Sequence, residues 1–190
     1  IEEMSIYIDY KTIIEYIDKI NIYHLAYLLK KLSVIEIDKL LEYIITNEKN
    51  NDLAEYIIIN YLCNSDLSEL IVNCIICDNI GVLKILIKKN LSIDYDNIFK
   101  LSCKYDSLKC IKYLFYEGNI KKLYKDDVCF LIDNNSIKIT EWAIKLYKNI
   151  FTVEVFEYAC DKKSYNFAKL IYDNVKIPIE IINKYENYEN

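Results

Sequence analysis

The chain has 190 residues, of which 53% are hydrophobic and 28% charged, and its formal net charge is −5. These values are typical of a globular protein and exclude an intrinsically disordered chain. The chain contains two Gly and one Pro, against a usual combined share of about 12%. This scarcity argues against β-sandwiches, barrels and doubly wound sheets, whose turns need both residues, and favours helices joined by short polar turns.

Charge and hydropathy argue against two classes of partner. All 24 basic residues are Lys and the balance is acidic, whereas nucleic-acid binders carry clustered Lys and Arg. No apolar run reaches the roughly 18–20 residues of a membrane span, and no basic-then-apolar signal sequence opens the chain. The seven Cys are odd in number and lie in apolar helical patterns, which indicates reduced thiols in a cytoplasmic compartment. We therefore expect no nucleic-acid and no membrane partner.

Two segments of the second half share one pattern. Residues 99–103 and 156–160 both begin with Phe and carry small or apolar residues three and four positions later. A short polar turn follows each, and then a second apolar helix over 107–115 or 164–171. Matching units occupy 13–29, 41–59, 71–87 and 128–144. Each unit thus predicts a first helix, a turn and a second helix, and stacked copies would bury one continuous core.

The residue that opens each second helix shows the period most clearly. These residues are Asn21, Asp52, Asn79, Ser107, Ser136 and Ser164. They are separated by 31, 27, 28, 29 and 28 residues. All six belong to the types favoured as N-caps, so we expect each side-chain oxygen to accept a hydrogen bond from a backbone N–H of the first helical turn.

The unit resembles the ankyrin repeat. Residues 110–118 (Cys-Ile-Lys-Tyr-Leu-Phe-Tyr-Glu-Gly) and 82–87 (Val-Leu-Lys-Ile-Leu-Ile) are similar to the second helix of that repeat. Residues 102–103 and 159–160 match the small residues with which its first helix packs. The Thr-Pro-Leu-His start motif and the Gly of the inter-helix turn are absent, and the period is shorter than the usual ~33 residues. The resemblance therefore implies an all-α solenoid of about six ankyrin-like repeats with shortened or missing β-hairpins. A TPR- or HEAT-like array is the alternative, although the TPR pattern does not occur.

The composition also bears on the source of the chain. Ile, Asn, Lys and Tyr dominate, and their codons are AT-rich. Together with the repeat, this bias resembles the divergent ankyrin-like proteins of large DNA viruses, of giant amoebal or pox type. The first residue is Ile1, so we expect the chain to be part of a longer protein.

A single repeat domain is expected over residues 1–190. The repeats are placed near 12–32, 38–62, 68–90, 96–118, 126–149 and 154–174, with a C-terminal cap over 178–190. Residues 1–10 form a lead-in, Pro178 suits the first turn of a capping helix, and the polar end from Tyr185 to Asn190 is expected to fray. Residues 178–181 also resemble the opening of the F-box-like segment of poxviral ankyrin proteins, but too few residues follow to form that module.

Residues that could carry chemistry are few. The lone His24 cannot form a metal site or a relay by itself. The C-x-x-C pair Cys74 and Cys77 lacks the second pair of a zinc ribbon and falls at a core-packing position. Asp126-Asp127 precedes a helix, where carboxylates are favoured, and Gly118 is expected as a helix C-cap. No catalytic, cofactor or metal site is predicted, and the chain is not expected to be an enzyme.

We expect a partner to bind the exposed side of the first helices. A solenoid presents an extended concave surface to its partners. Residues one and five positions after the first apolar residue of each first helix should lie on this concave surface. They give a candidate partner-binding set of Glu42, Thr46, Val72, Ile76, Lys100, Lys104, Asp133, Glu157 and Asp161, with Cys129 at the remaining position. This column is apolar in the third repeat, basic in the fourth and acidic in the last two, a mixture that suits a protein partner.

The sequence predicts a non-enzymatic protein-interaction module, acting as an adaptor in the host cytoplasm. The alternatives are a structural component of a virion or larger assembly, and a solenoid appended to another domain. A continuous apolar stripe on the opposite face or stable homo-oligomers would favour the structural alternative.

Overall fold

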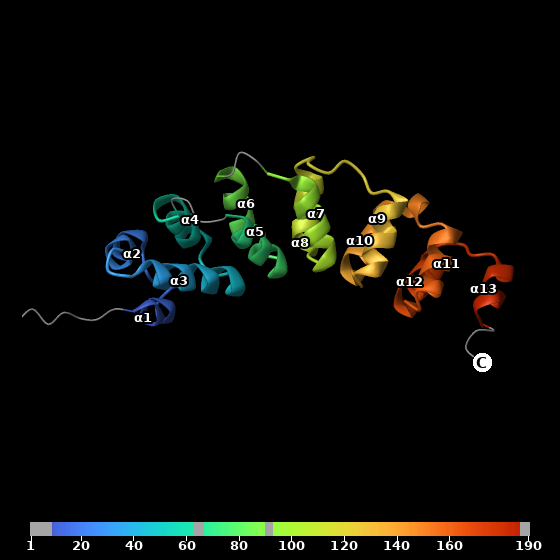
Figure 1. Cartoon of the computed structure of the whole chain (residues 1–190), viewed down its shortest axis with the longest axis horizontal. Helices are drawn as coiled ribbons and strands as arrows, with labels where there is room; N and C mark the ends of the chain where they lie inside the picture. Colours follow the sequence, from blue (N-terminus) through green and yellow to red (C-terminus); the bar gives the residue numbers. More distant parts are fainter. Residues whose placement is uncertain (1–8, 63–66, 90–92, 187–190) are drawn as a thin grey trace, which may run out of the picture. The chain divides into compact units, whose positions relative to one another are not determined.

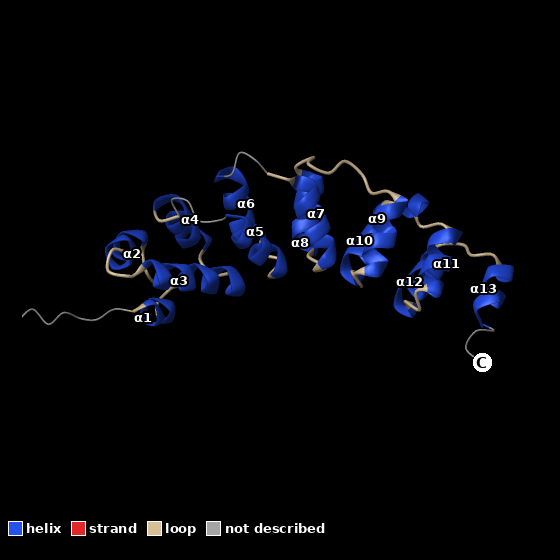
Figure 2. Cartoon of the chain, in the orientation of Figure 1, coloured by secondary structure: helices blue, strands red, loops and turns tan. Residues whose placement is uncertain are grey.

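A computed structural model describes residues 9–62, 67–89 and 93–186 of the chain. Within these residues the secondary structure is helical, with one short 3-10 turn and no strand (Figure 2). The predicted all-α solenoid without β-hairpins is therefore confirmed. The chain divides into two compact units, Ile1–Ile93 and Asp94–Asn190, which we call unit 1 and unit 2.

Unit 1 contains three helix pairs (Figure 1). Its helices are α1 (Tyr10–Glu15), α2 (Ile22–Leu29), α3 (Val34–Asn47), α4 (Asn51–Asn60), α5 (Leu67–Ile76) and α6 (Ile80–Lys89). The first helices α1, α3 and α5 pack against their neighbours in that order, and the second helices α4 and α6 pack against each other. This arrangement makes two layers, one of first helices and one of second helices.

Unit 2 repeats the same two-layer packing. Its helices are α7 (Tyr95–Lys104), α8 (Leu108–Tyr116), α9 (Lys125–Asp133), α10 (Ile137–Leu146), α11 (Val153–Asp161), α12 (Tyr165–Asn174) and α13 (Ile179–Glu186), with the 3-10 turn Lys148–Ile150. The first helices α7, α9 and α11 pack in succession, as do the second helices α8, α10 and α12.

The helices form because their apolar residues recur at helical spacing. In α6, Val82, Leu83, Leu86 and Ile87 are all buried, as predicted. In α8, Cys110, Ile111 and Leu114 are buried as well, while Phe115 is half-buried. The face of each helix pair that the pattern assigned to the core is therefore the face that packs.

The turns within the third to sixth repeats each have a left-handed residue. Asp78, Asp106, Asn135 and Lys163 have φ of 51°, 53°, 57° and 56°. Each directly precedes the residue that opens the second helix. In every case the backbone N–H of that opening residue donates to the carbonyl five positions earlier, as in Ser164 to Ala159 at 2.8 Å. This is the Schellman ending of a helix. Asp and Asn tolerate the left-handed region better than most residues, which explains how three of these turns form without Gly.

The predicted caps are partly confirmed. Asn21 accepts a hydrogen bond from the backbone N–H of His24 at 2.9 Å, and Asn79 accepts one from Val82 at 3.2 Å. Asp52 does not cap α4, because Asn50 takes that role through Leu53 and Asp52 lies in the first turn. The structure therefore corrects the prediction for Asp52.

The prediction that the three serines cap their helices is also corrected. Ser107, Ser136 and Ser164 occupy the N-cap position, but none makes a side-chain cap hydrogen bond. Ser136 instead donates its hydroxyl to the carbonyl of Cys103 in the preceding repeat. The serine is thus used between repeats rather than within its own helix.

Side chains in the turns connect neighbouring repeats of unit 1. The amide of Asn50 donates to the carbonyl of Ile17 at 2.9 Å, and the buried amide of Asn79 donates to the carbonyl of Ile45 at 3.0 Å. Each bond runs from the start of a second helix to the end of the preceding first helix. The carbonyl of Ile45 also accepts a longer bond from the backbone N–H of Glu48 at 3.5 Å, so the Asn79 amide completes the pairing at this helix end.

Unit 2 makes the equivalent connection with different groups. The carboxylate of Asp106 accepts hydrogen bonds from the backbone N–H groups of Lys138 and Ile139, both at 3.0 Å. Asp106 therefore caps α10 from the preceding repeat, while Ser136 donates in the opposite direction to Cys103. We call these bonds between turns the inter-repeat links.

The ends of the chain depart from expectation at one point. The lead-in over residues 1–8 and the tail over 187–190 lie outside the described residues. Pro178 directly precedes α13. Tyr185 does not fray, since it is helical, its ring meets Phe156 edge-on at 6.3 Å, and its hydroxyl donates to Asp161 at 2.9 Å. These contacts hold α13 against α11.

Candidate partner-binding surface

The nine predicted binding residues all lie on first helices. Glu42 and Thr46 are on α3, Val72 and Ile76 on α5, Lys100 and Lys104 on α7, Asp133 on α9, and Glu157 and Asp161 on α11. All keep accessible surface: Val72 and Glu157 are half-buried and the other seven exposed, and Cys129 is half-buried. The candidate surface differs between the two units.

In unit 1 two surface pockets lie along the packed first helices. One lies between α1 and α3, measures about 530 Å³ and includes Thr46 in its lining; the other lies between α3 and α5 and measures about 340 Å³. Glu42 and Lys39 line both pockets. The ammonium of Lys39 also lies 5.5 Å from the centre of the Tyr10 ring. Two of the nine predicted residues therefore border hollows in the first-helix layer.

The apolar members of the set lie on α5. Ile76 keeps 47% of its surface exposed and Val72 is half-buried. Neither residue borders the two pockets. The structure thus brings Glu42 and Thr46 together with the pockets and leaves Val72 and Ile76 on a separate part of the layer.

In unit 2 the two lysines of α7 differ from the acids that follow. Lys100 and Lys104 are exposed, and no ion pair joins either ammonium to an acid within the described ranges. Lys104 lies 5.5 Å from the centre of the neighbouring Tyr105 ring. These two charges are therefore available to a partner.

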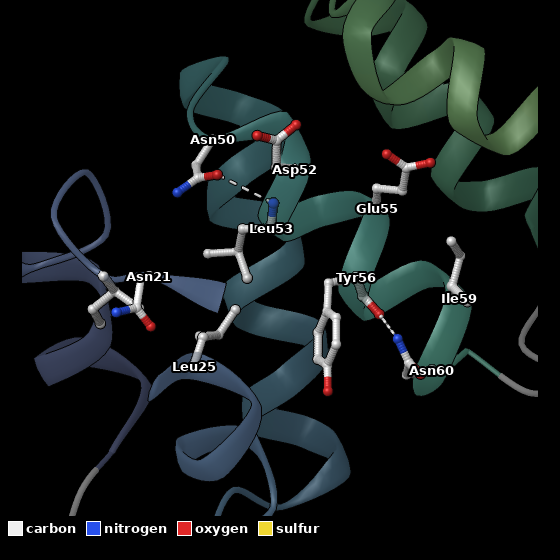
Figure 3. Close-up of a pocket in the computed structure, with 10 residues that line it drawn as sticks. Asn21, Leu25, Asn50, Asp52, Leu53, Glu55, Tyr56, Ile59 and Asn60 are labelled. Atoms are coloured by element: carbon white, nitrogen blue, oxygen red, sulfur yellow. Dashed lines mark hydrogen bonds between the residues drawn. The ribbon is translucent and has the colours of Figure 1, made fainter. Parts of the chain in front are cut away.

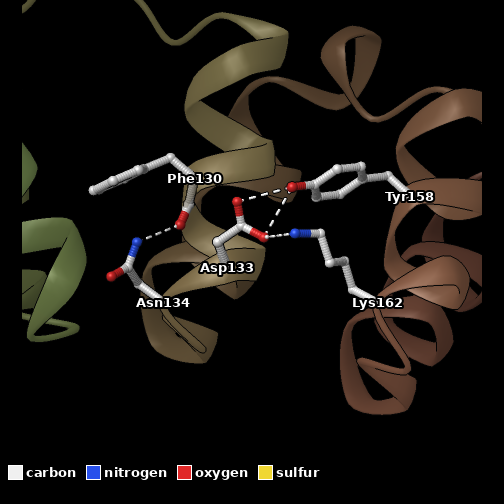
Figure 4. A network of polar contacts seen from close by, with 5 residues as sticks. All are labelled: Phe130, Asp133, Asn134, Tyr158 and Lys162. Atoms are coloured by element: carbon white, nitrogen blue, oxygen red, sulfur yellow. Dashed lines mark hydrogen bonds and ion pairs between the residues drawn. The ribbon is translucent and has the colours of Figure 1, made fainter.

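Asp133 is engaged by the next repeat (Figure 4). Its carboxylate accepts hydrogen bonds from the hydroxyl of Tyr158 at 2.8 Å and forms an ion pair with Lys162 at 3.0 Å. Burial would raise the pKa of Asp133, but the bonds from Tyr158 and Lys162 outweigh it and hold the pKa below its usual value. The same contacts raise the pKa of Lys162.

The pattern recurs one repeat later. Tyr185 donates to Asp161 as Tyr158 does to Asp133, and Lys184 pairs with Glu157 at 2.8 Å. The hydrogen bond to Glu157 is the main cause that raises the pKa of Lys184. All three predicted acidic binding residues of unit 2 are therefore matched by groups of the chain itself.

The other residues considered for chemistry are buried or lie at helix ends. Cys74 is buried on α5, and burial raises the pKa of its thiol to about 12, so it is not a thiolate at neutral pH. Asp127 accepts a hydrogen bond from the backbone N–H of Tyr124 at the start of α9. Burial raises its pKa. Gly118 ends α8 with φ 72°, as predicted.

Metal-ligand clusters and membrane-spanning helices are both absent from the described residues. They contain no group of three or more His, Cys, Asp or Glu placed to hold a metal ion. None of the helices in that same part of the chain is both long and apolar enough to cross a membrane.

Three features were missed by sequence reasoning. A pocket lies between α2 and α4 (Figure 3). A capping box at α3 joins Ser33 and Glu36, and its spacing could have been found because it follows the Ser-x-x-Glu pattern. Half-buried Trp142 of α10 meets Phe115 of α8 edge-on, with ring centres 5.3 Å apart.

Paired, sequentially adjacent helices in two layers define the class of helical-repeat solenoid proteins. Comparison with known proteins gives one relative, a putative ankyrin repeat protein of Acanthamoeba polyphaga mimivirus, 29% identical over 96 residues. The match covers 47% of this chain and 16% of the relative, so the chain spans a small part of that protein. No family model matches the chain, and no solved structure does. The similarity supports an ankyrin-like family at most.

Proposed function

We propose that the chain is a non-enzymatic protein-interaction module that binds a protein partner through its first-helix face. The observation that carries the proposal is the pair of exposed lysines on α7, Lys100 and Lys104, which form no ion pair within the described residues. They lie in a layer whose neighbouring acids, Asp133 and Glu157, are matched by groups of the chain itself. Exposed charges without internal partners are the ones that guide and select a partner.

The comparison supports the same class of function. Ankyrin-like stacks present extended surfaces for binding other proteins, and the relative is named as a putative ankyrin repeat protein of a virus. We propose further that the chain acts as a viral adaptor in the host cytoplasm, a role that the similarity to a viral protein supports weakly. A catalytic role is not part of the proposal, because the buried Cys74 and the capping Asp127 have the structural surroundings described above.

The test compares two charge-reversal variants of the chain. Lys100→Glu with Lys104→Glu changes the first-helix face, whereas Lys145→Glu with Lys169→Glu makes the same charge change on α10 and α12, where both lysines are exposed. Each tagged variant is expressed in host cells, and captured proteins are quantified by mass spectrometry. We expect the first variant to lose a partner that the native chain and the second variant both capture.

Circular dichroism of each variant shows whether the helices persist. Equal capture by both variants would contradict the proposed face. Loss from the second variant alone would assign the partner to the second helices instead.

A further inference from the structure

The layer of second helices in unit 1 is interrupted between α2 and α4. Elsewhere in that layer α4 packs directly against α6. Between α2 and α4 there is instead a pocket of about 570 Å³ (Figure 3). This volume falls within the range of roughly 300–1,000 Å³ that binding pockets occupy.

The base of this pocket, the α2–α4 pocket, is apolar. Leu25 of α2 and Leu53 of α4 are 1% and 3% exposed, and they face one another in Figure 3. Half-buried Tyr56 extends the apolar surface, and Ile59 stays 60% exposed at its edge. A large apolar side chain bound here would cover Ile59 and contact the ring of Tyr56.

The rim of the α2–α4 pocket is acidic. Asp52 and Glu55 lie one helical turn apart on α4 and both line it. Neither carboxylate has an ion-pair partner in the part of the chain that the structure describes, and no Lys lines the pocket.

The amide groups that share the lining are used internally. Asn60 donates to the carbonyl of Tyr56 at 2.8 Å, and Asn50 donates to Ile17 while it caps Leu53. The carboxylates of Asp52 and Glu55 are therefore the groups of this pocket that would interact with a charged occupant.

We propose that the α2–α4 pocket binds a segment of a partner protein that presents a large apolar side chain next to a lysine or arginine. The apolar side chain packs on Tyr56 and Ile59, above the buried Leu25 and Leu53, and the cation meets Asp52 and Glu55. Unit 1 favours such a partner at longer range too, because residues 1–93 hold nine Lys against fourteen Asp and Glu, a net charge of −5. The site lies in the second-helix layer and does not depend on the first-helix face.

The experiment uses the full chain labelled with ¹⁵N and fluorescent ten-residue Gly/Ser peptides. One peptide carries Trp-Lys at its centre, a second carries Trp-Glu and a third Ala-Lys. We expect Trp-Lys to bind and to shift the amide signals of Leu25, Tyr56 and Ile59. We expect Trp-Glu and Ala-Lys to bind at least about tenfold more weakly. Trp-Glu lacks the cation that meets the carboxylates, and Ala-Lys lacks the large apolar side chain.

A matched pair of variants locates the charge effect. Glu55→Lys should weaken Trp-Lys binding about tenfold or more, whereas Glu15→Lys, an equal change at an exposed residue of α1, should alter it less than about twofold. Ile59→Ser removes the exposed apolar edge with little risk to folding and should also weaken binding.

The proposal is overturned if the peptides bind equally, if Glu15→Lys weakens binding as much as Glu55→Lys, or if the shifted amides lie elsewhere. It is also overturned if sedimentation velocity shows a dimer that Glu55→Lys dissociates, since the occupant would then be a second copy of the chain.

Discussion

The two units share a fold but distribute charge differently. Residues 1–93 hold nine Lys against fourteen acids, a net charge of −5, whereas residues 94–190 hold fifteen Lys against fifteen acids and are neutral. In unit 2, ion pairs join neighbouring first helices, as in Lys162–Asp133 and Lys184–Glu157. In unit 1, Asp52 and Glu55 border a pocket without a cation. One repeat pattern can therefore use its acids for internal pairing or leave them for a partner.

The inter-repeat links differ in the same way. In unit 1 the links of Asn50 and Asn79 each use one amide that donates to the preceding repeat and accepts from its own helix. In unit 2 those tasks are divided between the hydroxyl of Ser136 and the carboxylate of Asp106. The difference teaches that the link is set by position in the turn rather than by residue type. The contribution of the link to the free energy of unfolding can be measured in each unit.

The largest effect is expected at Asn79. Asn79→Ala removes both hydrogen bonds of a buried amide. It leaves the Val82 N–H unpaired and the Ile45 carbonyl with only the long bond from the Glu48 N–H at 3.5 Å, at a cost of about 3 kcal/mol. Urea unfolding followed by circular dichroism measures the change. Trp142, the single Trp, reports on unit 2 by fluorescence in the same samples.

Asn79→Ser serves as the control because it introduces the residue found at Ser107 and Ser136. It should cost about half as much. A loss below about 1 kcal/mol for Asn79→Ala would show that the buried link carries little of the stability of unit 1.

A smaller loss is expected at Asp106 of unit 2. Asp106→Ala removes two hydrogen bonds to α10 and places Ala in the left-handed region, for a cost of about 2 kcal/mol. Asp106→Asn keeps an oxygen acceptor and tolerates that conformation, so it should cost less than about 1 kcal/mol. Trp142 fluorescence during urea unfolding measures both losses. Equal losses would mean that the one oxygen kept by Asn does not replace the two oxygens of the carboxylate.

A gain of stability is expected at Lys163. Its φ of 56° lies where a β-carbon is unfavourable, so Lys163→Gly should stabilise unit 2 by about 1 kcal/mol. At Asn135, with φ 57°, the same substitution should give roughly half of that gain or less because Asn already tolerates the conformation. Thermal unfolding compares the two. A destabilised Lys163→Gly variant would mean that the flexibility of Gly in the unfolded chain dominates.

The smallest effect concerns the ion pair at Asp133. Its pKa in the folded chain lies below the ordinary aspartate value of 3.8. Its contribution to stability is therefore present above that pH and is lost as the pH falls through the folded-state pKa. The carboxylate is 40% exposed, which limits the cost of Asp133→Asn at pH 7 to about 0.5 kcal/mol.

Urea unfolding at several pH values measures this difference, which should shrink towards zero at low pH. Glu141→Gln on α10 is the control, because no hydrogen bond or ion pair is described for that carboxylate. A difference that stays constant with pH would contradict a role for the charge of Asp133.

The helix pairs could be predicted because their signal is local. The spacing of Val82, Leu83, Leu86 and Ile87 defines one face of a helix without knowledge of its neighbour, and that face is buried. The cap at Asp52 was wrong because the turn before it offers Asn50 as well, and the cap depends on where the preceding helix ends. The left-handed turns had a readable signal, since Asp or Asn precedes the opening residue at 78, 106 and 135.

The inter-repeat links and the α2–α4 pocket could not be predicted in the same way. Asn79 meets a carbonyl 34 residues earlier, and such a pairing depends on how successive repeats stack. The predicted binding column was placed on the correct helices, but the pairing of Asp133 with Tyr158 depends on side chains from two repeats. Local periodicity gives the exposed positions and not the partners that they find.

The inter-repeat links also affect how the array comes apart. In a stack where each repeat contacts its neighbours alone, unfolding proceeds along the chain, and the coupling at each junction decides whether it stops there. The hydrogen bonds of Asn50, Asn79 and Asp106 would couple the unfolding of the two repeats that each of them joins. Amide hydrogen exchange should then show neighbouring helix pairs exchanging together where such a bond is intact. A single substitution in one turn could then divide a cooperative array into segments that open one after another.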